Sequence, residues 1–442
     1  MRTLRIEDCE ALVVENWMMG FVMKLGGCVK DMVWTVVTFY RVLFKLWRRG
    51  EGGSLKATRE AFPSLTQQEM VYLYSLSIIP FLWDTPHYRR GTFREDGVAN
   101  LKNVAIPGTG IPLSYVAYTR VGFYLFLLAG VPLITFVAAI VEARTMTSSL
   151  GEVATAFRKH LLGPDDWFSR WRMNCRVASL HAAVTGCEEY ALEDKLAFLD
   201  AAEDAGLAVT PSLSVEKLIV KHRNEEGGLG FHAFTNAKSG GDWIIQPAIK
   251  NSDALNTLLP QNAPLSTFRV VTSSRGGVPR DDLSMAPEVP RSAIKALSCV
   301  WRAGREGAAT DHSSILFDVD VENRVFGDGS VNAGWYELGP RALWTTPFRN
   351  DEVMGIHLDS GVQVTGTPLE RAQDIVDMAA DFHHMLIPHL PFAGWDVAFV
   401  EGGELQILEL NASCNFFQGH VDQDEYTRVL WEYFEGCDGS VH

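Results

Sequence analysis

Near the carboxy-terminal end of the chain, acidic residues occur at a spacing that suits a divalent cation. They lie in 394–413, "GWDVAFVEGGELQILELNAS", where two alternating apolar runs flank Gly402 and Gly403. A Gly-Gly pair between such runs predicts a two-residue β-hairpin turn, because both central residues of that turn need positive φ. This turn would set Asp396 directly opposite Glu409.

The same pairing would place Glu401 opposite Glu404 and Asn411 on the face of Glu409, since side chains alternate along a strand. Two carboxylates that face each other destabilise a hairpin. A hard cation reverses that effect, and Mg²⁺ prefers carboxylate and amide oxygens. We therefore predict that Asp396, Glu409 and Asn411 bind Mg²⁺, with Mn²⁺ as an alternative metal. A solvated polar patch is the other interpretation of this spacing.

Composition limits the class of protein. A chain of 442 residues is long enough for two or three domains. The net charge of −15 argues against a nucleic-acid partner. Seven scattered cysteines without a CxxC pair indicate neither a disulfide framework nor a zinc site. We therefore expect a reducing, cytoplasmic location, and the first residues have no pattern of a cleavable signal peptide.

The amino-terminal part differs from the rest in charge and pattern. Residues 1–60 have a net charge of +3, and the remainder has −18. Apolar residues at steps of three and four predict an amphipathic helix over 17–47, and its lysines, arginines and tryptophans are typical of a helix on a membrane surface. A helix packed on a neighbouring domain is the alternative.

A second apolar segment, 121–141, contains 21 residues without a charge. Its length suits a membrane span. A single span would place the fifteen Lys/Arg of 1–120 on the side away from the catalytic part, against the positive-inside tendency. We therefore favour a re-entrant or monotopic hairpin on the cytosolic face of the membrane. A buried core helix is the alternative.

The rest of the chain alternates between helical and β-type patterns. Residues 150–210 have helical spacing, and so has 369–387. Between these segments stand short runs of the β type. The sequence therefore predicts an α+β region after a mostly helical, apolar amino-terminal part. The predicted strands are 217–221, 242–246, 267–273 and 314–321.

A glycine-rich loop follows the first of these strands. In "LIVKHRNEEGGLGF" the strand ends at Lys221, and Gly227, Gly228 and Gly230 come soon after it. Glycines let backbone N–H groups close on phosphates, and a lysine adds a positive charge. The chain has no GxxxxGK[ST] string, so this is not a Walker A loop. The next run, "DWIIQP", offers backbone groups that could hold an adenine.

The order of these features resembles the ATP-grasp superfamily. Asp396 precedes the Glu-x-Asn pair by thirteen residues, as an aspartate does in D-alanine–D-alanine ligases. The stretch "EDKLAFLDAAEDAGLAVTP" is similar to a segment of the superfamily that carries its first nucleotide-contacting lysine. The resemblance implies that Lys195 and Lys221 contact the nucleotide and that Gln246 and Ala248 form the adenine hinge.

A closer resemblance is to the sugar-transfer associated ATP-grasp family, over about residues 150–425. It is carried by "DWIIQPAIKNSDALNTLLPQNAPLSTFRVVT", "HLDSGVQVTGTP" and "GWDVAFVEGGELQILELNAS". It implies two α+β subdomains that grip ATP, and ATP-dependent activation of a carboxylate. An acylphosphate would form, and an amine would displace its phosphate. Arg269, on the strand "TFRVVT", would steady the transferred phosphoryl group.

We expect a ligase that is associated with a membrane through 17–47 and 121–141 and that takes small carboxylate and amine substrates. A phosphotransferase and an inactive nucleotide-binding scaffold are the alternatives. Substrate specificity would come from loops within 278–310 and 331–366. The expected regions are a helical, membrane-associating part at 1–145, a helical lead-in at 146–215, a nucleotide-binding subdomain at 216–265 and a catalytic subdomain at 266–442.

Overall fold

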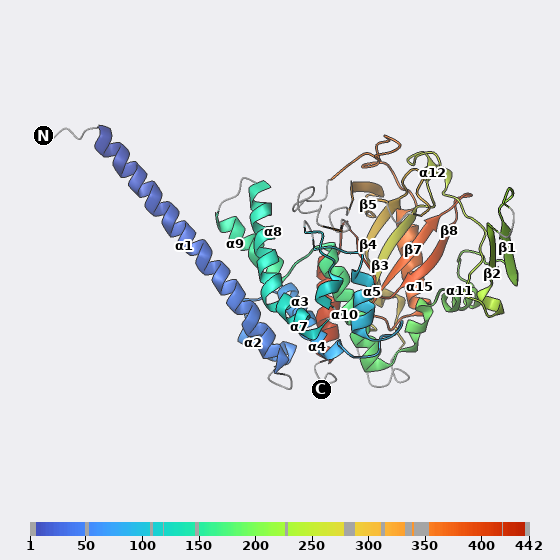
Figure 1. Cartoon of the computed structure of the whole chain (residues 1–442), viewed down its shortest axis with the longest axis horizontal. Coiled ribbons are helices and arrows are strands. Elements are labelled where there is room, and N and C mark those ends of the chain that lie inside the picture. The colour runs from blue at the N-terminus through green and yellow to red at the C-terminus, as the bar shows by residue number, and fades with distance from the viewer. Residues whose placement is uncertain are drawn as a thin grey trace.

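The chain joins a helical amino-terminal region to an antiparallel β-sheet (Figure 1). The structure is a computed structural model. It describes residues 6–48, 53–106, 109–117, 119–145, 150–225, 229–277, 288–310, 314–331, 338–339, 353–417 and 419–437. Helices and strands both contribute to the cores of this molecule. The predicted mixed α and β class is therefore confirmed.

The helices of the amino-terminal region come first in the chain, and capping boxes begin two of them. Thr66 and Thr92 each accept a hydrogen bond from the N–H of a glutamate three residues later, and that glutamate accepts one in return. The region contains α1 (Ile6–Trp47), α2 (Leu55–Ala61), α3 (Gln67–Ser77), α4 (Ile79–Leu82), α5 (Phe93–Leu101), α6 (Ser114–Ala117), α7 (Arg120–Leu125), a π-turn η2 (Phe126–Gly130), α8 (Val131–Thr145), α9 (Leu150–Leu162) and α10 (Trp167–Thr185).

The helix predicted over 17–47 is present and is longer than expected. Near its end, Phe39, Val42 and Leu43 are fully buried against the neighbouring helices. One turn earlier, Val33 and Trp34 are about 60% exposed, at 57% and 61%. The first turns of α1 extend away from the rest of the molecule (Figure 1). Cys28 and Thr35 are buried as well, so packing on neighbours covers one face of α1 from Cys28 onward and leaves Val33 and Trp34 uncovered.

Residues 120–142 run as one continuous helix through α7, η2 and α8, so the hairpin expected at 121–141 is wrong. The π-turn lies just before Pro132, which has no N–H to bond the carbonyl of Leu128. The hydroxyl of Tyr40 donates to that carbonyl instead. Only 11% of the most apolar stretch is buried, which also argues against a core helix. By length and composition it is the one helix among the described residues that could cross a membrane.

The six-stranded sheet follows the helical region and has the order β6-β5-β4-β3-β7-β8, with antiparallel neighbours throughout. A separate two-stranded sheet, β1 with β2, projects from the far side of the molecule (Figure 1). The predicted strands at 217–221, 267–273 and 314–321 are confirmed. The strands are β1 (Lys217–Lys221), β2 (Phe231–Thr235), β3 (Thr267–Ser274), β4 (Ile294–Ala303), β5 (Ile315–Asp320), β6 (Val325–Ser330), β7 (Phe392–Phe399) and β8 (Leu405–Asn411).

One of the predicted strands is wrong, and one strand was not predicted. The run 242–246 is not a strand, because only Trp243 makes a β-bridge, to Asn236. The central strand β4 lies within 278–310, where only specificity loops were expected to matter, and those loops stay a prediction. Both faces of β4 are largely buried, so its sequence shows little of the alternation that identifies a strand with one solvated face.

Different helices cover the two faces of the sheet. One face, with Val270, Trp301 and Trp395, packs against α15 (Ala372–Leu386). The opposite face, with Val271 and Phe392, packs against α16 (Gln423–Cys437) and the amino-terminal helices. Short helical elements complete this part of the chain: η3 (Glu188–Glu193), α11 (Lys195–Asp204), η4 (Ala237–Ser239), α12 (Asp253–Asn256) and η6 (Arg291–Ala293).

Candidate active site

A cleft of about 1940 Å³ lies over the sheet face that the amino-terminal helices cover. The side chains that point into it follow from strand alternation. On β3, Arg269 is two residues from Val271 and so shares its face. On β7, Asp396 is paired directly with Arg269 in the strand register. Sequence alternation thus brings a cation and an anion to neighbouring positions on the floor of one cleft.

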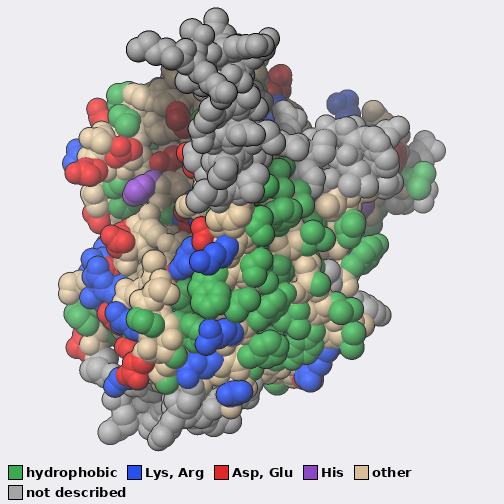
Figure 2. All heavy atoms as spheres, turned by 90° about the vertical axis from the view of Figure 1, so that its left-hand side faces the viewer, with side chains coloured by type: hydrophobic (Ala, Val, Ile, Leu, Met, Phe, Trp, Pro, Cys, Tyr) green, Lys and Arg blue, Asp and Glu red, His purple; other side chains and the backbone are tan. Residues whose placement is uncertain are grey.

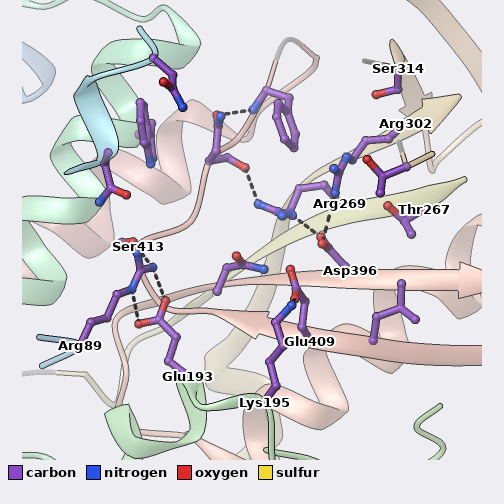
Figure 3. A pocket seen from close by; sticks show the side chains of 18 of the residues that line it. Arg89, Glu193, Lys195, Thr267, Arg269, Arg302, Ser314, Asp396, Glu409 and Ser413 are labelled. Atoms are coloured by element: carbon purple, nitrogen blue, oxygen red, sulfur yellow. Dashed lines mark hydrogen bonds and ion pairs between the residues drawn. The ribbon is translucent and has the colours of Figure 1, made fainter. Parts of the chain in front are cut away.

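Asp396 is held between two guanidinium groups (Figure 3). Arg269 Nε lies 2.6 Å from Asp396 Oδ1, and Arg302 Nη1 lies 3.2 Å from Oδ2. The side chain of Asp396 is only 7% exposed. Burial would raise the pKa of Asp396, but the two arginines outweigh it and hold that pKa below its usual value. This carboxylate therefore stays ionised.

The ring of Phe417 packs against the guanidinium groups of both arginines. Its ring centroid lies 5.2 Å from the guanidinium of Arg269 and 5.4 Å from that of Arg302, which is a cation–π arrangement. Phe417 has a φ of +56°, which is rare for a bulky residue. Its N–H donates to Asn415 Oδ1 at 2.9 Å, which stabilises this local conformation. Strained backbone of this kind gathers at functional sites.

The predicted pairing of Asp396 with Glu409 is confirmed, although the turn differs from the one expected. Phe399 pairs with Leu405, so Glu401 lies in the loop and the expected pair of Glu401 with Glu404 is wrong. Gly402 and Gly403 do have positive φ, at 91° and 84°. The longer loop shifts the register by one residue. A β-bulge restores it before Asp396 and Glu409 meet.

Glu409 is bound by Lys195, whose Nζ lies 2.6 Å from Glu409 Oε2. Lys195 is the first residue of α11, and the side chain of Asp194 caps that helix. Three cations, Lys195, Arg269 and Arg302, thus surround two carboxylates. Three cationic side chains gathered on one cleft floor suit a phosphate group.

Asn411 ends β8, where it pairs with Gly394. Its side-chain Nδ2 is buried and has no hydrogen-bond partner among the described residues. A buried polar group without a partner costs about 1–3 kcal/mol. An amide in that state, beside two carboxylates, fits a role in ligand binding. These three side chains supply the oxygen donors that Mg²⁺ prefers, although the described residues contain no group of three or more His, Cys, Asp or Glu that could hold a metal.

Of the other predicted nucleotide contacts that the structure describes, only Gln246 lines the cleft. Gln246 donates to the carbonyl of Thr210 at 3.2 Å. Lys221 lies on the exposed hairpin β1–β2, with its ammonium 5.8 Å from the ring of Phe231. Gly230 has a φ of +65° on the same hairpin, and neither it nor Ala248 lines the cleft. Gly227 and Gly228 lie outside the described residues.

Sequence reasoning missed several cleft residues, among them Arg302, Arg89 and Glu193. Arg302 is a lone charge in the apolar run "SCVWRA", and that isolation was a usable signal. Arg89 and Glu193 form an ion pair at the edge of the cleft (Figure 3), and the sequence carries no motif that joins them. They belong to the helical region and to η3, not to the sheet.

Solved structures similar to this chain include the ATP-grasp ligase PsnB complexed with a minimal precursor, Mg and ADP, and the same ligase complexed with the minimal precursor. The first has 14% sequence identity and a TM-score of 0.25, and the match covers 67% of this chain and 74% of that one. The second has 14% identity and a TM-score of 0.24, with 65% and 74% covered. No family model and no curated protein matches the chain. At these TM-scores the similarity does not assign a function to this chain.

Proposed function

We propose that this chain is an ATP-dependent carboxylate–amine ligase of the ATP-grasp type. The observation that carries this proposal is the pair of carboxylates, Asp396 and Glu409, set opposite each other by a bulge and surrounded by three cations. The clustering of these three cations on the floor of a cleft and the unpartnered amide of Asn411 favour a site for a phosphate with its metal.

Six side chains of the cleft have a role in this proposal. Asp396, Glu409 and Asn411 would hold Mg²⁺, which when bound supplies positive charge to the phosphate oxygens. Lys195 would move from Glu409 to the nucleotide phosphates. Arg269 and Arg302 would stabilise charge on the transferred phosphoryl group, because phosphoryl transfer depends mainly on positioning and electrostatics.

The reaction balances in two steps. A carboxylate oxygen of the first substrate attacks the γ-phosphorus of ATP, the bond to the β-phosphate oxygen breaks, and ADP leaves. The nitrogen of an amine then attacks the acyl carbon of the acylphosphate. The C–O bond to phosphate breaks, the amine loses a proton, and an amide and inorganic phosphate remain. The acceptor in this proposal is a membrane-bound or glycan-related amine.

The test is release of ADP and phosphate from Mg·ATP in the presence of pooled carboxylates and pooled amines. We expect release only when both pools are present and its loss in Glu409→Gln. The matched control is Glu404→Gln, an exposed glutamate at the start of β8 that does not line the cleft. ADP formation without free phosphate, with one hydroxyl-bearing substrate, would favour a phosphotransferase. Binding of nucleotide without turnover in any pool would favour the scaffold.

We also propose that the amino-terminal helices dock on an anionic membrane surface. Figure 2 shows a broad hydrophobic area on the side that α1 and α8 face, with lysines and arginines along its edges. The helix Arg120–Glu142 lies beside α1, because the hydroxyl of Tyr40 in α1 donates to the carbonyl of Leu128 in η2. Apolar side chains with a basic rim are typical of interfacial helices. The exposed apolar residues are Leu25, Val29, Val33, Trp34, Phe44, Val121, Tyr124, Leu125 and Leu133.

Sedimentation with phosphatidylcholine vesicles, with and without phosphatidylglycerol, tests this docking. We expect the full chain to bind the anionic vesicles, and Trp34→Asp with Leu125→Asp to weaken binding. The control is Leu218→Asp, at an exposed apolar residue of β1 on the opposite side of the molecule (Figure 1); Leu218 is 39% exposed, against 61% for Trp34 and 66% for Leu125. Equal binding by both variants would contradict the proposal.

A further inference from the structure

The amino-terminal helices contribute directly to the cleft. Asn100 of α5, Val104 after it and Trp171 of α10 line the same cavity as Asp396 and Glu409. Next to the cleft, the same sheet face is packed against these helices through Val271 and Phe392. The helical region is thus a neighbour of the catalytic strands and not only a docking segment.

The loop between α4 and α5 contributes Arg89 to the lining of the cleft. The N–H of His87 donates to the carbonyl of Gly91 at 2.9 Å, and Gly91 has a φ of +61°, which closes a tight turn. The ring of Tyr88 lies between those of His87, at 4.3 Å, and Tyr190, at 4.5 Å. Tyr190 belongs to η3, so this stack fixes the loop against the element that precedes α11.

Arg89, at the tip of this loop, makes three bonds (Figure 3). Its guanidinium contacts both carboxylate oxygens of Glu193, with Nε 2.7 Å from Oε2. It also donates to Ser413 Oγ at 2.6 Å. Glu193 in turn accepts the backbone N–H of Ala412 at 3.2 Å. We call this group, Arg89, Glu193, Ala412 and Ser413, the Arg89 clamp.

The Arg89 clamp touches the proposed phosphate site at two points. Ala412 and Ser413 directly follow Asn411, and Glu193 stands two residues before Lys195. A bidentate arginine–carboxylate pair is geometrically specific, so it restrains both chain segments together. Burial would lower the pKa of Arg89, but its bonds to Glu193 outweigh burial and raise that pKa, so the guanidinium keeps its charge.

We propose that Arg89 is a positioning residue that holds the end of β8 so that Asn411 faces the metal. The inference rests on the proposed function, because it needs a Mg·nucleotide in the cleft. It assigns to the helical region a part in catalysis that does not depend on a membrane. Deletion of the helical region would remove Arg89 as well as the docking surface, so the test uses the full chain.

The experiment is isothermal titration calorimetry, in which ADP is titrated into the full chain once in the presence of Mg²⁺ and once in the presence of EDTA. Loss of a group that orients a metal ligand typically lowers metal affinity by about 10- to 100-fold. We therefore expect Arg89→Ala to weaken Mg·ADP binding by about 10-fold or more and to leave ADP binding in EDTA unchanged. Arg89→Lys should lie between, because lysine cannot bind Glu193 in the bidentate way.

The matched control is Arg90→Ala, which removes the same charge one residue later, at an exposed side chain that does not line the cleft. It should bind like the wild type under both conditions. A purely structural role of Arg89 would lower the melting temperature and leave the effect of Mg²⁺ on binding intact, and that result would overturn the inference. A wild-type chain that binds ADP equally with and without Mg²⁺ would overturn the proposed function itself.

Discussion

The two parts of the predicted nucleotide site differ in how the chain holds them. On the six-stranded sheet, Arg269 and Asp396 are buried, paired in register and bonded to each other. On the hairpin β1–β2, all five residues of β1 are exposed, and Lys221 contacts only the ring of Phe231 among the described partners. The sheet residues are preorganised, and the hairpin residues are not.

This difference separates stability from binding. A charge that neighbours already neutralise contributes to folding before any ligand arrives, so its loss affects both properties. A charge on an exposed hairpin contributes little to folding, so its loss changes only the affinity for a ligand that contacts it. Substitutions should therefore cost most stability in the buried sheet and least on the exposed hairpin.

The largest effect is expected for Asp396→Asn. The substitution removes the negative charge that Asp396 supplies to the buried guanidinium groups of Arg269 and Arg302. Removal of one partner from a buried ion pair costs about 3–5 kcal/mol of unfolding free energy. Urea denaturation followed by tryptophan fluorescence measures this loss. A loss below about 1 kcal/mol would mean that the sheet site is no more preorganised than the hairpin.

The next effect depends on pH and concerns the helix that supports the sheet. His383 of α15 is fully buried, with Nδ1 2.6 Å from Thr272 Oγ1, and burial lowers its pKa to about 3. The unfolded chain binds a proton near pH 6.5, so the native state loses stability as the pH falls from 6.5 toward 3. The slope is about 1.4 kcal/mol per pH unit for one histidine.

Denaturation curves between pH 7 and pH 4 test this titration. His181 has a pKa lowered to about 3 by burial and adds a second step of the same sign. Burial also lowers the pKa of His87 and of His357. His383→Asn should therefore remove roughly one proton from the pH dependence and leave the contributions of the other histidines. An unchanged slope would show that His383 does not titrate with unfolding.

A smaller loss is expected for Gly394→Ala, which tests how tightly the sheet site is packed. An added Cβ would lie 2.6 Å from Cys414 Cβ and 3.4 Å from Arg269 Cδ. Overpacking of this kind costs about 1–3 kcal/mol. Because the clash reaches Arg269, Mg·ADP affinity should fall as well. Gly402→Ala is not a suitable control, since its φ of +91° adds backbone strain. The control is Ala398→Gly, which removes a methyl group on the same strand at the residue paired with Thr267.

The sequence predicts the sheet site better than its surroundings. Alternation and the Gly-Gly pair place Asp396 opposite Glu409, because register follows from period-2 patterning. The loop length was wrong by one residue, and only the bulge in β8 preserved the pair. No local pattern could reveal such a compensation. The chain position of Arg302 could have been found from its isolation in an apolar run, whereas β4 was missed because a strand buried on both faces lacks alternation.

The Arg89 clamp could not be predicted from the sequence. Arg89 is 104 residues from Glu193 and 324 residues from Ser413 along the chain. No periodicity links residues so far apart, and their contact depends on how the helical region packs on the sheet. Long-range polar contacts of this kind emerge only from the folded structure.

The smallest effect on stability is expected for Lys221→Ala. Its side chain is exposed, and surface substitutions of this kind change the unfolding free energy by less than about 0.5 kcal/mol. If the hairpin closes on the nucleotide as the sequence predicts, loss of a charged hydrogen bond to phosphate should cost about 1.5–3 kcal/mol of ADP binding, or roughly 10-fold or more in affinity. Calorimetry and urea denaturation on the same sample measure both quantities. Unchanged ADP affinity would show that Lys221 is not part of the site, whose cations would then be Lys195 and the sheet arginines. A large loss of stability would show instead that the exposed hairpin contributes to folding as the sheet does.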